Sequence, residues 1–203
     1  MALEIPGPEA VQTSLIDLLR QEEIGSMSTK GADGFPHTSI MHCAADGLAM
    51  YFSTQRQRRK IQDIERDNRV SYAVAYMPPD GFYGRENTYS VQVRGRATMV
   101  ESQEEIDLAV QRSYEQFEWL KDTTMYDIFK NPPPQMRSCF FRVDPVFALW
   151  QDNGVHMGWT QYLTFNAEGT AIDEMVPVDS PNGVALWEKY LESVDDTPVG
   201  AAG

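Results

Sequence analysis

The sequence predicts a mainly β protein, a six- to seven-stranded antiparallel β-barrel with peripheral helices. Two observations predict this fold. Short apolar runs follow one another from residue 24 to residue 165, separated by turn sequences such as Asp46-Gly47. Few segments repeat apolar residues at helical spacing. A barrel is favoured over an open sheet because closure removes the exposed strand edges that invite aggregation.

The strand predictions come from alternating apolar residues bounded by turn residues. The expected strands are residues 24–29, 35–44, 48–54, 70–76, 88–100, 139–150 and 155–165. Since 203 residues with 42 % hydrophobic content suit one buried core, we expect a single domain over residues 1–165. Residues 166–203 are expected to form a C-terminal tail, partly irregular, with a short helix near 184–191.

Three helices are predicted outside the strands. Pro8 suits a first helical turn and Leu15 and Leu18 follow at helical spacing, so a helix is expected over residues 8–22. Ser102 and Glu105 form a capping-box pattern that begins a second amphipathic helix. The polar run over residues 55–68 predicts a short surface helix.

Composition excludes several classes of function. A formal charge of −13 argues against a general nucleic-acid binder, because phosphate-backbone affinity needs clustered cations over a broad surface. The sequence contains no run of about 20 apolar residues, the length that a membrane-spanning helix needs. The first residues also lack a basic segment followed by an apolar one, so a cytoplasmic protein is expected. Cys43 and Cys139 lack metal-ligand spacing, and we expect no metal site.

The histidines and a late aromatic segment leave alternatives open. His37 and His42 are five residues apart, so on one strand they point to opposite faces and cannot chelate one ion together. Haem needs only one axial histidine and stays an alternative. Trp119, Tyr126 and Phe129 suit a substrate mouth or equally a dimer interface.

A cluster of cations interrupts the acidic background. Arg56, Arg58, Arg59 and Lys60 place four cations in five residues, just after Thr54, which we expect to be the N-cap of the 55–68 helix. Cations near a helix N-terminus oppose the helix dipole, whereas a phosphate bound among them is stabilised by the dipole and by the free N–H groups. The cluster therefore indicates a phosphate site.

The geometry of this cluster sharpens the hypothesis. Arg56, Arg59 and Lys60 have the i, i+3, i+4 relation and would project from one helix face, while Arg58 would point elsewhere. The alternative is a solvated charged face, neutralised by acidic residues from later turns. Those acidic residues are Asp63, Glu65 and Asp67.

Four ordered segments resemble a known family. Residues 51–54, Arg59-Lys60 and residues 67–70 resemble the flavin-phosphate signature of pyridoxamine 5′-phosphate oxidase and its relatives. Residues 35–41 are similar to the strand that lies along the flavin ring. Gln92 is similar to the glutamine of a later strand, and residues 141–151 to the late strand that ends in Trp-Gln.

The resemblance implies a homodimeric split β-barrel that binds flavin mononucleotide (FMN), with two flavins across a two-fold interface. It also implies the residues that contact the cofactor. These are Thr38, Ser39, Ile40, Met41, Ser53, Thr54, Arg59, Lys60, Gln92, Trp150 and Gln151. Among them Ser53, Thr54, Arg59 and Lys60 would hold the phosphate, and Gln92 would hydrogen-bond the cofactor.

The expected function is that of an FMN-dependent oxidoreductase, which transfers hydride to or from a small conjugated molecule with a nicotinamide electron donor. Residues 153–157 lack the arginine that grips pyridoxal phosphate in the oxidase itself, so vitamin-B6 oxidation is not expected. The alternatives are a deazaflavin-dependent reductase and a non-catalytic flavin or haem binding protein. A deazaflavin carries an acidic tail, and the charge of −13 offers little sign of a basic groove beyond residues 56–60. No catalytic side chain is identified.

Overall fold

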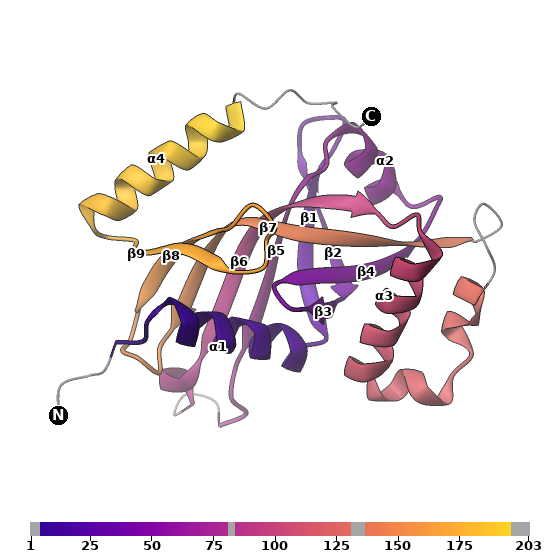
Figure 1. Ribbon diagram of the computed structural model, residues 1–203, viewed down its shortest axis with the longest axis horizontal. Coiled ribbons are helices and arrows are strands. Elements are labelled where there is room, and N and C mark those ends of the chain that lie inside the picture. The colour runs from indigo at the N-terminus through magenta and orange to yellow at the C-terminus, as the bar shows by residue number, and fades with distance from the viewer. Residues whose placement is uncertain (1–4, 81–83, 131–136, 196–203) are drawn as a thin grey trace.

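The computed structural model describes residues 5–80, 84–130 and 137–195, which form one curled antiparallel sheet with helices around it (Figure 1). The elements in chain order are α1 (Pro8–Gln21), β1 (Ile24–Lys30), β2 (Pro36–His42), β3 (Ala44–Asp46), β4 (Ala49–Gln55), α2 (Arg59–Arg66), β5 (Arg69–Tyr76), η1 (Arg85–Asn87), β6 (Tyr89–Met99), α3 (Gln103–Gln116), η2 (Glu118–Asp122), η3 (Met125–Lys130), β7 (Ser138–Asp152), β8 (Thr160–Phe165), β9 (Ile172–Pro177) and α4 (Pro181–Asp195).

The strand order explains how the sheet curls. Seven strands follow the order β2-β1-β5-β6-β7-β4-β3, and β8 and β9 extend from β7. Strands β2 and β3 are joined only by Cys43, yet they lie at opposite ends of this hydrogen-bonded path. The sheet therefore closes on itself without pairing its ends, which leaves a seam between β2 and β4. The predicted mainly β, split-barrel fold is confirmed.

The long strand β7 holds this sheet together. Its first half pairs with β4, its second half pairs with β8, and β6 pairs along nearly all of it. The register of β6 against β7 shifts after Arg94, which leaves Val146 as an extra residue. At this bulge a Cβ on Gly95 would lie only 2.5 Å from the carbonyl oxygen of Asp144, so the close approach requires glycine.

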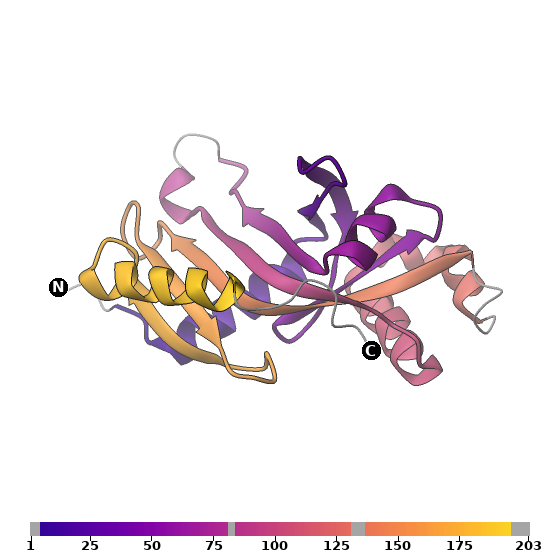
Figure 2. The same ribbon diagram turned by 90° about the horizontal axis from the view of Figure 1, so that it is seen from above.

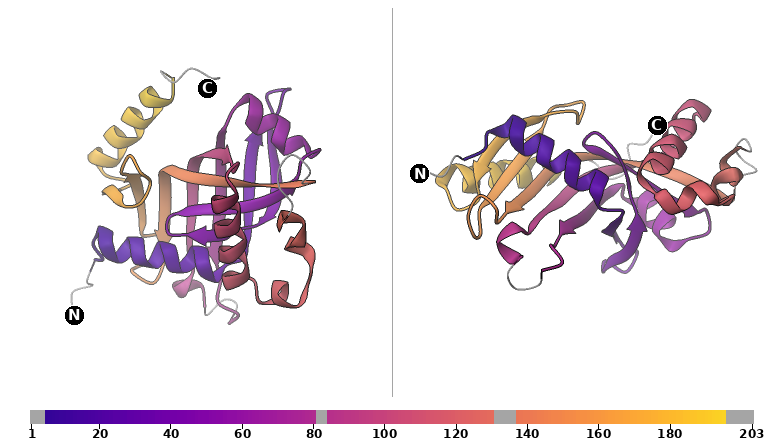
Figure 3. Two further views of the ribbon diagram at one scale, coloured as in Figure 1. Left: turned by 45° about the vertical axis from the view of Figure 1, so that its right-hand side comes forward. Right: turned by 90° about the horizontal axis from the view of Figure 1, so that it is seen from below.

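The helices cover different parts of the sheet. Helix α1 lies across one end of the strands and buries Leu15 and Leu18 in the main core (Figures 1 and 3). Helices α3 and α4 lie at opposite ends of the molecule (Figures 1 and 2). Under α3 and η3 a second cluster contains Phe117 and Phe140, and under α4 a third contains Phe147 and Leu186. Within the described residues, no helix is long and apolar enough to cross a membrane.

Several local predictions are confirmed and others are wrong. Ser102 caps α3, where its hydroxyl accepts a hydrogen bond from the Glu105 backbone N–H. The predicted helix over residues 55–68 begins late, at Arg59, with Arg58 as the N-cap residue. Thr54 is not the N-cap, because the ladder between β4 and β7 continues through Thr54 and Gln55 and keeps both residues extended.

The described part of the tail is more regular than expected. Residues 172–177 form β9, which pairs with β8, and the predicted short helix is the 15-residue helix α4. Two aromatic residues of α4, Trp187 and Tyr190, pack against Phe147 of β7 and fix the helix on the sheet. The sequence signal for β9 is weak because Asp173 and Glu174 interrupt its apolar alternation.

Asp63 fixes α2 to the sheet. Its side chain is 2 % exposed. Its Oδ2 accepts a hydrogen bond from the Thr29 hydroxyl and lies 3.0 Å from His37 Nδ1, and its Oδ1 accepts one from Arg66 at 2.9 Å. Burial alone would raise the pKa of Asp63, but the hydrogen bonds from His37, Arg66 and Thr29 lower it below its ordinary value. A charged, buried carboxylate therefore links α2 to β1 and β2.

The substitution Asp63→Asn is expected to lower the free energy of unfolding at pH 7 by ~2 kcal/mol, because it removes the charge from three hydrogen bonds. The folded pKa of Asp63 lies below its unfolded value, so this stabilisation is present above about pH 4 and is lost as the pH falls further. Urea denaturation at pH 7 and at about pH 3 measures both effects.

Glu65→Gln is the matched control, since Glu65 is an exposed carboxylate of the same helix. It should change the free energy of unfolding by less than about 0.5 kcal/mol. Equal stability of the two variants at pH 7 would contradict the role of Asp63.

Candidate functional site

A cavity of about 520 Å³ opens at the seam, and we call it the seam cavity. It is lined by His37, Ser39, Ile40, Met41 and His42 of β2, by Ser53 of β4, by Arg58, Arg59 and Lys60 at the start of α2, and by Trp119, Met125 and Tyr126 of the η2–η3 segment. The seam thus brings together segments that are up to about ninety residues apart in the sequence. Its volume is in the usual range for small-molecule sites, about 300–1,000 Å³.

Strand β2 contributes five lining residues to this cavity. Strand β2 is the last strand of the sheet and pairs only with β1, so the described structure gives no strand partner to its other edge. Edge strands present unpaired N–H and C=O groups that can bind another molecule. Residues 35–41 were predicted to lie along a flavin ring, and residues 36–41 belong to this strand.

Three cations line the same cavity. Arg58 precedes α2, Arg59 and Lys60 are in its first turn, and that turn has no acidic residue. Arg59 lies 3.5 Å from Asp33, but both side chains are more than half exposed, so the pair contributes little stabilisation. A helix start with an excess of cations is a favourable place for a phosphate.

The cation set differs from the predicted one. Because α2 begins at Arg59, Arg56 is not on the helix, and the predicted face of Arg56, Arg59 and Lys60 does not form. The backbone N–H of Arg56 donates to the Arg137 carbonyl, and its side chain reaches Met99 rather than the cavity. Arg58 takes its place in the cavity wall.

Lys60 is the most constrained of these cations. Its Nζ lies 2.8 Å from Met41 Sδ. Burial lowers the pKa of Lys60, and the neighbouring charge of Arg58 lowers it further. Burial raises the pKa of the nearby Cys43 thiol to about 12, so Cys43 stays neutral and does not compensate the ammonium group. An anion in the cavity would supply the missing charge and stabilise the protonated lysine.

The remaining wall is apolar and aromatic. Ile40 is 68 % exposed and Met125 54 % exposed, although both are large hydrophobic side chains. The Trp119 indole N–H donates to Glu23, and the same carboxylate oxygen contacts His42 Nδ1. Glu23 therefore holds two rings of the wall in place. Exposed apolar side chains beside clustered cations suit a ligand with a flat apolar part and an anionic end.

Six of the predicted cofactor residues line the seam cavity, and two other predicted residues, which are adjacent to them in the sequence, do not. The six are Ser39, Ile40, Met41, Ser53, Arg59 and Lys60. Thr38 points away and contacts the Ser28 hydroxyl at 2.9 Å. The Thr54 carbonyl lies 3.7 Å from Cys139 Sγ, and Thr54 is not among the lining residues.

The other three predicted residues lie elsewhere in this chain. Gln92 is on β6 and lines a separate hollow with Arg94. Trp150 is 1 % exposed inside the main core, and the Gln151 amide donates to Asn153. Their contact with a cofactor stays a prediction that rests on the family resemblance.

Several lining residues were missed or left open. Trp119 and Tyr126 line the cavity, whereas Phe129 is buried in the second core cluster. The only signal for the first two was the aromatic content of their segment. His37 and His42 both line the cavity, each with its Nδ1 beside a carboxylate. Among the residues that the structure describes, no three His, Cys, Asp or Glu side chains form a metal-binding group.

The comparisons with known structures agree with this fold. The chain superposes on a haem-binding protein from Mycobacterium smegmatis with a TM-score of 0.59 and 14 % identity, covering 82 % of this chain and 61 % of that one. It superposes on a conserved hypothetical protein from Mycobacterium tuberculosis with a TM-score of 0.55 and 20 % identity, covering 76 % and 90 % of the two chains. Identities this low show the fold alone.

The sequence comparisons decide the family. No curated protein matches the sequence. The family model described as pyridoxamine 5′-phosphate oxidase matches residues 13–145, which include β1 to β6, α2 and the seam cavity. The match covers well over half of the 203 residues. The chain belongs to the pyridoxamine 5′-phosphate oxidase family.

Proposed function

We propose that this protein is an FMN-dependent oxidoreductase whose cofactor binds in the seam cavity. The observation that carries the proposal is the convergence of Arg58, Arg59 and Lys60, with no acidic residue in the same helical turn, on a cavity with an apolar wall. This combination suits a nucleotide with a phosphate at one end and a flat ring system at the other.

The residues present fit such a cofactor. Arg59, Lys60 and the Ser53 hydroxyl would hold the phosphate, while the edge of β2 and the Trp119 side chain would bound the ring. When bound, the flavin supplies hydride transfer at its ring nitrogen N5. The chain would bind and orient the cofactor and exclude water, so no acid–base pair is required. A small conjugated substrate and a nicotinamide electron donor complete the proposal.

A homodimer in the cytoplasm is part of the same proposal. It rests on the family resemblance and is supported by the exposed Ile40 and Met125 at the opening of the cavity, since exposed apolar patches often mark interfaces. A second copy would cover them and shield a bound ring from water.

A second candidate is a non-catalytic haem or flavin binding protein. Its support is that His37 and His42 both line the seam cavity with Nδ1 beside Asp63 and Glu23, respectively. A histidine held at Nδ1 offers Nε2 as a metal ligand, and a single axial histidine is sufficient for haem. A fold neighbour that carries the name haem-binding protein agrees with this candidate.

The double substitution Arg59→Ala/Lys60→Ala is expected to raise the Kd for FMN by about 100-fold, because two charge-assisted hydrogen bonds are lost. The Kd for riboflavin, which lacks the phosphate, should change by less than about threefold. Fluorescence quenching titrations measure both affinities. The matched control is Arg20→Ala/Arg85→Ala, which removes two exposed cations away from the cavity. Equal losses for FMN and riboflavin would contradict the phosphate role.

The visible spectrum of the purified protein separates the two candidates. The oxidoreductase proposal predicts a flavin spectrum that bleaches when a nicotinamide donor is added under anaerobic conditions. The conjugated substrate is left out, so that the reduced flavin has no acceptor and stays reduced. A Soret band that disappears in His37→Ala or His42→Ala would instead establish the haem-binding candidate. A protein that takes up neither flavin nor haem would rule out both.

Light scattering during gel filtration tests the assembly. A homodimer has a mass of about 46 kDa, twice the 23.0 kDa of one chain. A mass of one chain at micromolar concentration, in the presence of FMN, would contradict the dimer. The proposed cofactor site would then rest on the cations of the seam cavity and not on a second copy.

A further inference from the structure

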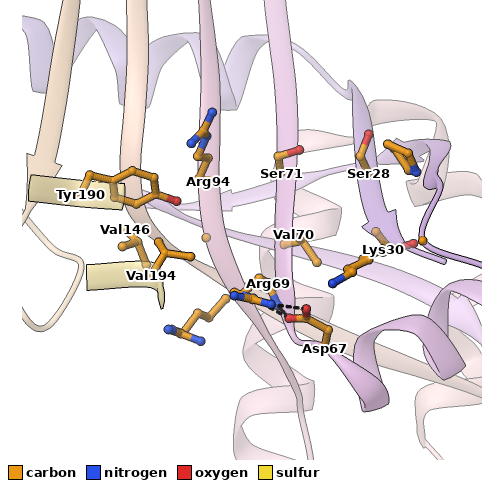
Figure 4. A pocket seen from close by; sticks show the side chains of 15 residues that line it. Ser28, Lys30, Asp67, Arg69, Val70, Ser71, Arg94, Val146, Tyr190 and Val194 are labelled. Atoms are coloured by element: carbon orange, nitrogen blue, oxygen red, sulfur yellow. Dashed lines mark hydrogen bonds and ion pairs between the residues drawn. The ribbon is translucent and has the colours of Figure 1, made fainter. Parts of the chain in front are cut away.

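A second cavity, of about 430 Å³, lies on the outer face of the sheet beside the end of α4, and we call it the α4 cavity. Its walls come from β1, the start of β2, β5, β6, β7 and α4, and it shares no lining residue with the seam cavity. Figure 4 shows Val146, Tyr190 and Val194 along one side, with Ser28 and Lys30 along the other. It therefore has an apolar end and a polar end.

The lining of this cavity is strongly basic. Four cations line it, namely Lys30, Arg69, Arg94 and Arg96. Asp67 is the one acidic lining residue within the described part of the chain, and Arg69 binds both of its carboxylate oxygens. Among the described residues, Lys30, Arg94 and Arg96 have no ion-pair partner. Four cations and one acid give a net charge of +3 in a protein whose formal charge is −13.

Two aromatic side chains of α4 stack on Arg94, and this stacking does not use the hydrogen-bond donors of Arg94. The guanidinium carbon of Arg94 lies 4.3 Å from the centre of the Trp187 ring and 5.3 Å from that of Tyr190. Stacking uses the face of the guanidinium group, whereas its five N–H donors lie in the plane. Arg94 also lines the adjacent hollow, so it stands at the border of the two.

The apolar end depends on the bulge in β7. Val146 is the extra residue there, because Arg94 pairs with Phe147 and Gly95 pairs with Pro145. The bulge leaves Val146 40 % exposed, on the same side of the cavity as Tyr190 and Val194 of α4. A pure inorganic anion would use only the basic end of the cavity, whereas a ligand with an apolar part would use both ends.

We propose that the α4 cavity is a second ligand site, which binds a small organic polyanion whose acidic groups are carried by an apolar framework. The acidic groups pair with Lys30 and Arg96, and the framework packs against Val146 and Val194. The site is separate from the proposed cofactor site, so it gives the protein a place for a second small molecule.

Isothermal titration calorimetry on the full chain tests this site with two probes, benzene-1,3,5-tricarboxylate and pyrophosphate. The tricarboxylate is expected to bind at least about tenfold more tightly than pyrophosphate, because its ring also contacts the apolar end. Lys30→Gln/Arg96→Gln is expected to weaken binding of the tricarboxylate by about tenfold or more. Val194→Asp, a change in the last turn of α4, adds a negative charge at the rim and should also weaken it.

The control is Arg59→Ala/Lys60→Ala, which alters only the seam cavity and should leave the affinity for the tricarboxylate unchanged. Thermal unfolding of each variant shows that it is folded. Binding that is lost in this control but kept in Lys30→Gln/Arg96→Gln would place the probe in the seam cavity and overturn the proposal. Absence of binding to the folded wild-type protein would also overturn it, and would fit a cavity covered by a second copy. Neither result bears on whether FMN binds at the seam.

Discussion

The buried carboxylate of Asp63 is the interaction on which the candidate site depends. It binds Thr29 of β1, His37 of β2 and Arg66 of its own helix, so it fixes α2 against the edge of the sheet. Ile61 and Ile64 also anchor α2 by packing in the main core, and Asp63 adds the polar link that ties the helix to β1 and β2. In this position of the helix, Arg58, Arg59 and Lys60 line the seam cavity.

The seam itself is a consequence of strand order. Because β2 and β3 are consecutive in the chain but end the sheet on opposite sides, the barrel curls without closing. The free edge of β2, the start of α2 and the η2–η3 segment meet there, and each supplies a different chemistry: backbone groups, cations and aromatic rings. Cations for a phosphate and aromatic or apolar groups for a ring are the combination on which the proposed nucleotide site rests.

Much of the fold could be predicted from the sequence, because strand alternation and turn residues are local signals. The capping box of α3 is local as well, and it was predicted correctly. The start of α2 was predicted wrongly, because pairing between β4 and β7 keeps Thr54 extended and no local pattern reports that pairing. Strand β9 was missed for a similar reason, since only its pairing with β8 defines it.

The candidate sites divide in the same way. Arg58, Arg59 and Lys60 are adjacent in the sequence, so their clustering at the start of α2 could be predicted. Only tertiary folding brings Trp119 to the seam cavity and the Asp63 carboxylate to His37. The cations of the α4 cavity come from three different strands, so no local pattern in the sequence shows that they lie together. The formal charge of −13 gives no sign of a basic cavity either. Net charge describes a whole surface and does not report how charges are distributed on it.

A crystal structure of the protein grown with FMN tests the central claim most directly. We expect the phosphate oxygens within hydrogen-bonding distance of Arg59 and Lys60, and the ring beside the edge of β2. Clear density for FMN at any other place, with the seam cavity occupied by solvent alone, would contradict the account.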